Sequence, residues 1–541
     1  MSDLAYAPAT GLVFEEQAAV VVSDPNRTDI ALFVGFVGVR SGAEAPAAVR
    51  AWLEAQGWLR PERSRSALPD LLDVPVPVDS WDTFDRLFDW QARPIAAVGA
   101  TAPAGADENR ATTYLGAAIR SFFSQGGRKC YVVRVGDPWP VLAPPAGPDR
   151  SAAIAKLLPG YPLAFTASPS DPAGWHGMAH LFGLPDVSFV CLPDLADAVG
   201  AQPPPPEPAT LPAAALEIFT ECSDAEIGSI VQNPTRSIRA PRCAEPGFEE
   251  WARGLSLAAG ALARFAREAQ LVAAVPIPLE GTPAAGALLG YLQGPDRRGG
   301  GPLTRGLFTG LDGLASAFVQ LTYPWLRTAG SDNLPEGLES PDGVLTGLLA
   351  RNALTRGTFR SAATTAHAHL ADVYDVDPQL SHAQMHRPLA DAAGTCRSLI
   401  QRVSLFGYAP AGLRLLSDVT TSAQESYRPA AVNRLTSVIV RAARRLGEAL
   451  TFDSSGERLW AEVRSGMTSL LLGLLQGGAL RGATPTEAFS VRCDRSTMTQ
   501  NDLDAGRVIV EVQFDPAAPV ERITVMLALA EGGRVSLVSE N

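Results

Sequence analysis

Lysine is almost absent from this sequence of 541 residues, in which Lys129 and Lys156 are the only two lysines. A Schiff base and the P-loop of nucleotide-binding proteins both need a lysine. The sequence also contains no P-loop motif, no GxGxxG after a strand and no GxSxG nucleophile elbow. Most candidates for lysine-dependent chemistry are therefore missing, and these three motif-based sites are absent from the sequence.

Cysteine is sparse, and no two cysteines form a CxxC pair. The six are Cys130, Cys191, Cys222, Cys243, Cys396 and Cys493. This scatter argues against a zinc ribbon, a redox motif or a disulfide scaffold. We interpret the cysteines as reduced and mostly buried, with a bridge between Cys222 and Cys243 as the alternative.

Long apolar runs and a basic surface are absent as well. No apolar run approaches the roughly 18 to 20 residues of a membrane helix, and Met1 to Tyr6 does not begin a secretory signal. We expect cytoplasmic synthesis and assembly without membrane insertion.

The net charge is -12, and the excess of acid lies within residues 1 to 400. A role in nucleic-acid binding, which needs a concentrated basic surface, is therefore disfavoured.

Two histidine pairs have spacings that metal sites use, His367 with His369 and His382 with His386. A pair four residues apart on a helix can hold a metal ion. No glutamate lies between the second pair as metalloprotease chemistry requires. We interpret both pairs as solvated or structural and expect no metal, with metal binding as the less favoured alternative.

The last third of the chain has the clearest pattern. Residues 432–450 have the 3.6-residue rhythm of a surface helix, with leucine and isoleucine on one face and arginine on the other. A second helix is predicted to begin with a capping box at residues 454–457 and to end at Gly477-Gly478. Strands are predicted over residues 508–512 and 522–529.

Six short sequence words in this region resemble the C-terminal domain of contractile tail sheath proteins. That family occurs in contractile phage tails, R-type bacteriocins and extracellular contractile injection systems. The words are Val432–Leu435, Leu459–Trp460, Gly478–Gly482, Glu487–Asp494, Asn501–Gly506 and Pro519–Ile523. No single word is specific, but their order and spacing are similar to those of the family.

Earlier parts of the chain resemble the same family. A buried strand is predicted over residues 29–38, a capped helix over 80–88, and a helix over 114–123 that leads through Gly126-Gly127 into a strand over 130–135. Further words follow at residues 318–326, 340–351 and 355–359. The resemblance covers about residues 9 to 40, 80 to 136 and 315 to 530.

The resemblance implies an α+β (mixed α/β) fold with several domains. We expect an N-terminal arm over 1–28, a middle domain over 29–136 and 311–400, and an outer insertion over 137–310. An inner, tube-facing domain would span 401–515, and a C-terminal strand and arm 516–541. Inside the insertion, which matches no pattern, strands are predicted over 187–192 and 271–277 and a helix over 255–269.

The function that the resemblance implies is that of a structural sheath subunit, without enzymatic activity and without a cofactor. Copies would stack as six-membered rings around an inner tube and contract to drive that tube through a target envelope. The implied partners are further copies, the tube protein, baseplate and cap proteins, and paralogous sheath subunits. One alternative is a minor ring, cap or baseplate component. A more remote one is a cytosolic α/β enzyme with its site in the insertion.

The candidate functional residues are therefore those of inter-subunit contacts. By resemblance, both ends of the chain would cross to neighbours and extend their sheets; the alternative is that they complete the chain's own sheet. The candidate arm residues are Leu12, Val13, Phe14, Glu15, Ile523, Val525, Leu527, Leu529, Val535 and Leu537. Residues 531–534 between the last two strands are either a hairpin turn or an elbow.

A basic cluster, Arg441, Arg444 and Arg445, lies on the first of the two C-terminal helices. We interpret the cluster as a solvated helix face, with a contact with the tube or a neighbouring subunit as the functional alternative. Exposed ion pairs of this kind are worth about 0 to 1 kcal/mol each.

Overall fold

The structure is a computed structural model of the whole chain. It describes residues 27–58, 71–96, 110–203, 234–282, 288, 317–364, 367–390, 396–410, 412–422, 424–450, 456–501, 508–517, 526–530 and 534–538.

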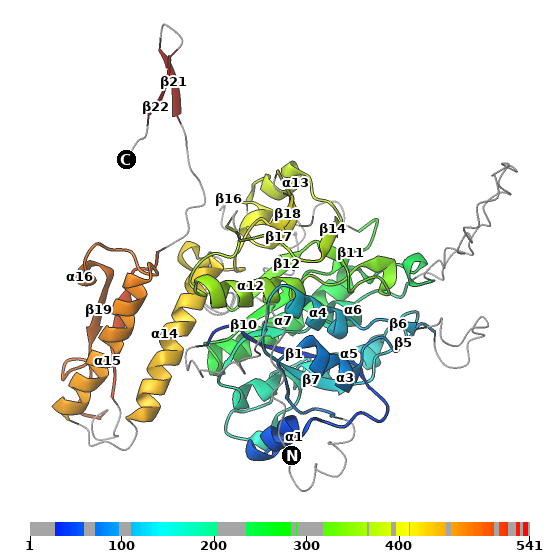
Figure 1. Cartoon of the computed structure of the whole chain (residues 1–541), viewed down its shortest axis with the longest axis horizontal. Coiled ribbons are helices and arrows are strands. Elements are labelled where there is room, and N and C mark those ends of the chain that lie inside the picture. The colour runs from blue at the N-terminus through cyan, green and yellow to red at the C-terminus, as the bar shows by residue number, and fades with distance from the viewer. Residues whose placement is uncertain are drawn as a thin grey trace, which may run out of the picture.

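An eight-stranded sheet forms the centre of the molecule (Figure 1). Six inner strands run parallel, and an antiparallel strand closes each edge. In spatial order they are β18 (Gly412–Leu415), β17 (Ser404–Ala409), β12 (Val319–Tyr323), β10 (Gln270–Ala274), β8 (Val187–Cys191), β1 (Ile30–Phe36), β7 (Cys130–Gly136) and β3 (Val76–Val78). Pro77 lies on the edge strand β3, where its missing N–H costs no ladder bond.

Both faces of the sheet are buried, which explains the uninterrupted apolar run of β1. Ile30, Leu32 and Val34 belong to the core on one face, whereas Ala31 and Phe33 belong to the core on the other. A strand buried on both faces is apolar throughout instead of alternating with polar residues. The predicted strand at 29–38 is confirmed.

Helices cover the two faces of the sheet. One face packs against α1 (Ala47–Ala55), α3 (Trp81–Leu87), α4 (Tyr114–Ser124) and α12 (Asp342–Arg356). The other packs against α5 (Gly147–Leu157) and α7 (Glu245–Phe265). The helix α12 crosses α4 closely because it carries glycine there: a Cβ at Gly343 would lie 2.4 Å from the Cα of Ala118. The N-cap of α3 is Ser80, whose hydroxyl accepts the N–H of Thr83, as its sequence predicts.

Short elements complete this part of the chain. The remaining helices are α6 (Leu195–Ala198) and α13 (His382–His386), with 3₁₀ turns η1 (Pro172–Gly174), η2 (Gly177–Gly183), η3 (Pro234–Ser237), η4 (Pro335–Gly337), η5 (Leu399–Gln401) and η6 (Glu425–Tyr427). The small strand pairs are β2 (Gly38–Val39) with β4 (Phe88–Asp89), β5 (Arg93–Pro94) with β6 (Arg110–Ala111), β9 (Arg242–Cys243) with β11 (Ile277–Pro278), β13 (Trp325–Thr328) with β14 (Val373–Asp377), and β15 (Leu389–Ala390) with β16 (Cys396–Arg397).

The sheet corrects two of the expected domain boundaries. The strands β8 and β10 come from the expected outer insertion, residues 137–310, yet they pair with β1 and β12 at the centre of the sheet. The expected inner domain, residues 401–515, likewise gives its first two strands, β17 and β18, to this sheet. Apolar runs identified β8 and β10 as strands but could not show which strands they pair with.

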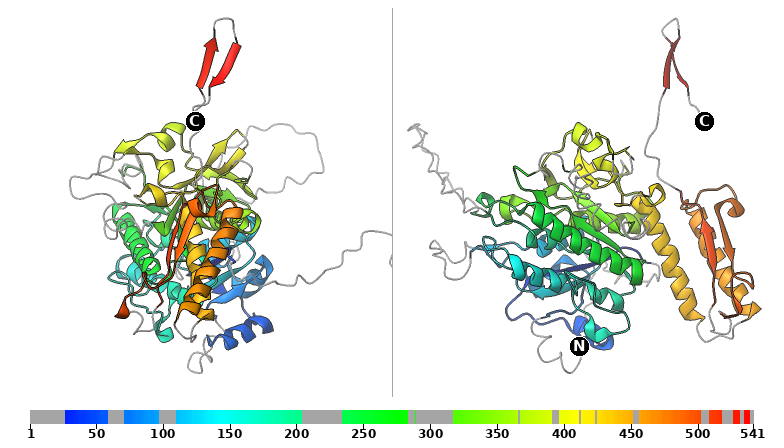
Figure 2. Two further views of the ribbon diagram at one scale, coloured as in Figure 1. Left: turned by 90° about the vertical axis from the view of Figure 1, so that its left-hand side faces the viewer. Right: turned by 180° about the vertical axis from the view of Figure 1, so that it is seen from behind.

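A smaller C-terminal unit lies at one end of the molecule (Figures 1 and 2). It consists of α14 (Ala430–Ala449), α15 (Glu457–Gln476), the short α16 (Pro485–Ala488) and the antiparallel pair β19 (Phe489–Arg492) and β20 (Glu511–Phe514). Its own apolar core includes Leu435, Ile439, Met467 and Leu471. Both predicted helices are confirmed, and the strand predicted at 508–512 forms three residues later.

The C-terminal end of α15 has the cap that the sequence predicts. Gly478 has a φ of 74°, and the N–H groups of Gly478 and Ala479 donate to the carbonyls of Leu475 and Leu474. This is a Schellman motif, which the double glycine predicts. At the other end the N-cap is Gly456, and the serines of the predicted capping box, Ser454 and Ser455, lie outside the described residues.

Beyond this unit, β21 (Met526–Ala530) pairs with β22 (Arg534–Val538) as an antiparallel hairpin. The hairpin stands apart from the rest of the ribbon in all three views (Figures 1 and 2). Among the described strands, β21 and β22 pair only with each other.

Candidate assembly elements: helix α14 and the C-terminal hairpin

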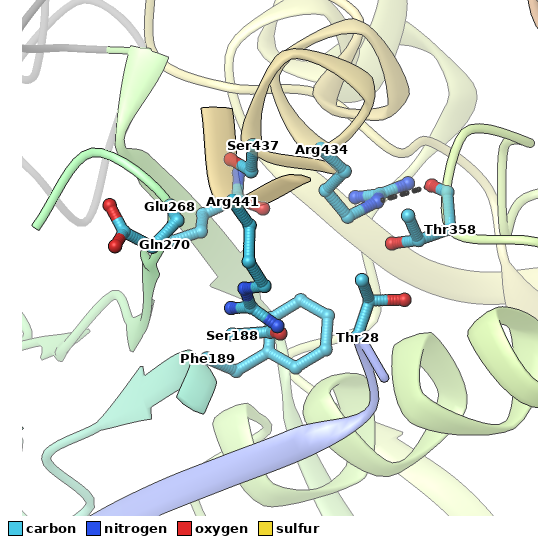
Figure 3. Close-up of a pocket in the computed structure, with 9 residues that line it drawn as sticks. All are labelled: Thr28, Ser188, Phe189, Glu268, Gln270, Thr358, Arg434, Ser437 and Arg441. Carbon is cyan, nitrogen blue, oxygen red and sulfur yellow. Dashed lines mark hydrogen bonds between the residues drawn. The ribbon is translucent and has the colours of Figure 1, made fainter. Parts of the chain in front are cut away.

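Helix α14 has two different faces. Leu435, Ile439 and Leu446 contact the core of the C-terminal unit. A polar stripe on the other face contacts the body around the sheet and consists of Arg434, Ser437, Arg441 and Arg444, spaced three, four and three residues apart. Figure 3 shows the first three of these residues. Residues at this spacing share one face of a helix. The helix therefore joins the unit to the sheet through polar contacts.

Arg441 is buried, which corrects the expectation that it lies on an exposed contact surface. Only 3% of it is exposed. Its Nη1 donates to the carbonyl of Arg27 at 2.5 Å, and its Nη2 donates to the carbonyl of Val187 at 2.7 Å. Burial lowers the pKa of Arg441 to about 10, so the guanidinium stays charged near neutral pH. Arg441 therefore fastens α14 to the backbone that leads into β1 and β8.

The other two predicted arginines lie differently. Arg444 is exposed but forms an ion pair with the buried Glu268, next to β10. Arg445 is half-buried, and its Nη1 has no hydrogen-bond partner among the residues that the structure describes. The three arginines thus do not form one exposed patch. Contact of Arg444 or Arg445 with another chain remains a prediction.

Arg434 was not among the candidate residues, yet it makes an ion pair that is buried on both sides. Its guanidinium donates to both carboxylate oxygens of Asp418, at 3.0 and 2.6 Å, and both side chains are buried. Burial alone would raise the pKa of Asp418, but the charge and hydrogen bonds of Arg434 hold it below its usual value. Gln320 and the N–H of Ala362 also donate to this carboxylate. The sequence did contain a signal for Arg434, because this residue belongs to the sheath-like word Val432–Leu435.

The sheet of the C-terminal unit is narrow for the helices that it faces. It has only the two strands β19 and β20 among the described residues, and both helices have 20 residues. Phe489, Val491, Val512 and Phe514 consequently stay only partly buried. A two-stranded sheet is marginal by itself, and both of its edges can accept a further strand.

The hairpin brings together four of the predicted arm residues. Leu527 is opposite Leu537, and Leu529 is opposite Val535. Residues 531–533, between the two strands, lie outside the described residues. The other predicted arm residues, Leu12 to Glu15, Ile523 and Val525, lie outside the described residues.

The residues weighed for metal or redox chemistry form no site in the described part of the chain. The rings of His382 and His386 stack with centroids 4.2 Å apart, and no group of three metal-ligating side chains occurs among the described residues. Cys130, Cys191, Cys243 and Cys493 are free, buried thiols, so the alternative bridge to Cys243 does not form. Within the described ranges, no helix is long and apolar enough to cross a membrane.

Several solved structures of contractile particles are similar to the whole chain. In the baseplate of the anti-feeding prophage (AFP) in its contracted state, a chain is 16% identical, with a TM-score of 0.56 over 97% of this chain and 100% of that one. The contracted AFP helical sheath is 18% identical, with a TM-score of 0.50 over 97% and 100%. The contracted PVC sheath complex of an extracellular contractile injection system is 15% identical, with a TM-score of 0.50 over 98% and 100%.

The chain has the fold of these sheath structures. The resemblance seen in the sequence is thus confirmed at the level of the fold, as is the mixed α/β class. No family model and no curated protein sequence matches the chain. The likeness to the AFP sheath covers 97% of the chain. Because one fold can serve several functions, the function is argued separately.

Proposed function

We propose that the chain is a structural subunit of the contractile sheath of a phage tail-like injection particle. Copies polymerise as stacked six-membered rings around an inner tube, and contraction of the stack drives the tube through a target envelope. The observation that carries the proposal is the likeness over nearly the whole chain to sheath structures of two contractile particles. The subunit acts by assembly and not by catalysis.

The C-terminal unit and the hairpin support a way of joining the copies. The two-stranded sheet β19–β20 leaves its apolar face half covered, and the hairpin β21–β22 of the same chain stands apart from it (Figure 2). A hairpin from a neighbouring copy would widen that sheet through main-chain hydrogen bonds. Such bonds do not depend on particular side chains, so they persist while side-chain interfaces are exchanged during contraction.

Contraction itself needs no cofactor in this proposal. The extended stack is a metastable packing, and the contracted stack has the more extensive interfaces, so that release is a shift between two packings. The baseplate begins the transition and the cap closes the far end. The partners are therefore further copies, paralogous sheath subunits, the tube protein, and baseplate and cap proteins. Assembly takes place in the cytoplasm.

A second candidate is a minor ring or baseplate component with the sheath fold. It is favoured by one specific observation, the likeness to a chain in the AFP baseplate structure. Such a component forms one ring, whereas a main sheath subunit forms many. The number of copies in a native particle separates the two.

Negative-stain electron microscopy of the purified chain, and of lysate from its source, tests the proposal. A sheath subunit forms hollow cylinders alone or wraps a thinner tube in the lysate. A single-ring component gives discrete rings in both samples. Monomers that assemble in neither sample would contradict both functions.

A further inference from the structure

A small pocket lies beside α14, where the polar stripe meets the amino-terminal ends of β8 and β10. Arg434, Ser437 and Arg441 of α14 line one side of the pocket, and Ser188, Glu268 and Gln270 line the other (Figure 3). The pocket thus lies inside the joint between the C-terminal unit and the sheet.

The pocket is surrounded by polar atoms that lack a hydrogen-bond partner within the described part of the chain. These atoms are Ser188 Oγ, Glu268 Oε2, Arg441 Nε and both polar atoms of the Gln270 amide. All four residues are more than nine-tenths buried. A buried polar atom without a partner costs about 1 to 3 kcal/mol, and most such atoms in proteins are satisfied by protein or by ordered water. Five such atoms around one pocket indicate that a small ligand binds there.

Size and charge decide which occupant fits. The space open to the centre of a water molecule is about 10 Å³, close to the roughly 10 to 15 Å³ that one water needs. A phosphate or sulfate is too large and would face the carboxylate of Glu268. A metal cation would lie beside the guanidinium groups of Arg434 and Arg441. The free atoms include donors and acceptors, and water can serve both.

We propose that this pocket is an internal water-binding site that completes the joint between α14 and the sheet. Water accepts from Arg441 Nε and from the Gln270 amide N–H, and it donates to Glu268 Oε2 and to Ser188 Oγ. It also bridges Ser188 of β8 to Gln270 of β10, whose side chains share no direct hydrogen bond.

The consequence is a joint made of exchangeable polar contacts. Along the stripe, α14 is held by arginine bonds to carbonyls and carboxylates and by this water, whereas on its opposite face it is held by apolar packing against α15. Water can replace polar contacts one at a time, so the joint opens at a lower free energy than the C-terminal unit unfolds.

A structure of the unmodified full chain at about 2 Å resolution or better tests the site without mutation, since ordered water is visible there. We expect a density peak within hydrogen-bond distance of both Gln270 and Ser188. A pocket with no density, or one closed by direct bonds between these side chains, would overturn the proposal.

Hydrogen–deuterium exchange gives a second test through a double-mutant cycle. The variants S188A, Q270M and the double variant are compared by the exchange rates of amides in β8 and β10. If water bridges the two side chains, their contributions are coupled, as those of contacting residues typically are. The amides of the double variant then exchange about fivefold more slowly than the product of the two single-variant rate increases predicts. The matched control pairs S188A with Q513M, an exposed site on β20, and its effects should multiply. Effects that multiply in both cycles would refute the bridge.

Discussion

The buried charges of this chain are held by partners that the sequence places far away. Arg434 donates to Asp418, which lies 16 residues earlier in the chain, and Arg441 donates to the carbonyl of Val187, which lies 254 residues earlier. Taking a charge out of water is costly unless its hydrogen bonds are complete. Each of these side chains therefore depends on the docking of α14 against the sheet.

Replacing Arg434 by methionine leaves Asp418 buried without its cation. We expect R434M to lose about 3 to 5 kcal/mol of stability, measured by chemical denaturation of the full chain. The matched control is R481M, which removes an exposed ion pair with Asp515. That change should cost no more than about 1 kcal/mol. Equal losses in the two variants would contradict the assignment of Arg434.

Three buried carboxyl groups predict that the protein is less stable in mild alkali. Burial raises the pKa of Glu339 to about 8, of Asp194 to about 7 and of Asp342 to about 6. The folded chain therefore binds more protons than the unfolded chain between about pH 4 and these values. The stability that these groups contribute is complete below pH 4 and is lost as the pH rises through 6 to 8.

Thermal unfolding from pH 5 to pH 9 measures this effect. The unfolding midpoint should fall by several degrees across the range. The variant E339Q keeps partners for Ser121 and Thr328, which both donate to Glu339, but it cannot titrate. Its midpoint should fall less steeply, and an unchanged slope would exclude Glu339 as a cause.

At the scale of single elements, local patterns in the sequence predicted most of what forms. The rhythm of α14, the double glycine after α15 and the cap of α3 are each set by neighbours within a few residues, which a sequence shows directly. The role of the arginine face was not predictable in this way. Periodicity shows which residues share a face of α14, but not whether that face meets water or the carbonyls of a distant strand.

Two glycines of α15 offer a matched test of its C-terminal end. Gly478 has positive φ, so G478A should destabilise the C-terminal unit by about 1 to 2 kcal/mol. Gly473 is exposed within the helix, and a Cβ there would contact nothing. G473A should therefore stabilise the unit by up to about 1 kcal/mol. Hydrogen exchange of α15 measures both, and changes of the same sign would contradict the Schellman assignment.

The C-terminal hairpin should be needed for polymerisation but not for folding. It pairs with no other described strand, so deletion of residues 526–541 should leave the circular dichroism and the unfolding midpoint of the subunit unchanged. Long cylinders should no longer form in electron micrographs. A milder variant, L527K with L537K, places like charges opposite each other in the hairpin and should have the same effect. Normal cylinders from either variant would contradict the role of the hairpin.

At the scale of the whole molecule, the sequence indicated the sheath fold and the C-terminal helices better than the middle of the chain. The strands β8 and β10 were recognised as strands, but they were assigned to an insertion because the sequence around them matched no family word. Their place beside β1 and β12 depends on pairing between segments that are far apart in the chain. The sequence of a strand that is buried on both faces does not indicate which strands it pairs with.

The measurement that tests the central claim most directly is a helical reconstruction, by cryo-electron microscopy, of the assembly that the full chain forms. We expect stacked rings of six copies, with the β21–β22 hairpin of one copy hydrogen-bonded to the β19–β20 sheet of another. A closed single ring would instead identify a baseplate or cap component. An assembly in which every hairpin pairs within its own chain would contradict the proposed joining of subunits.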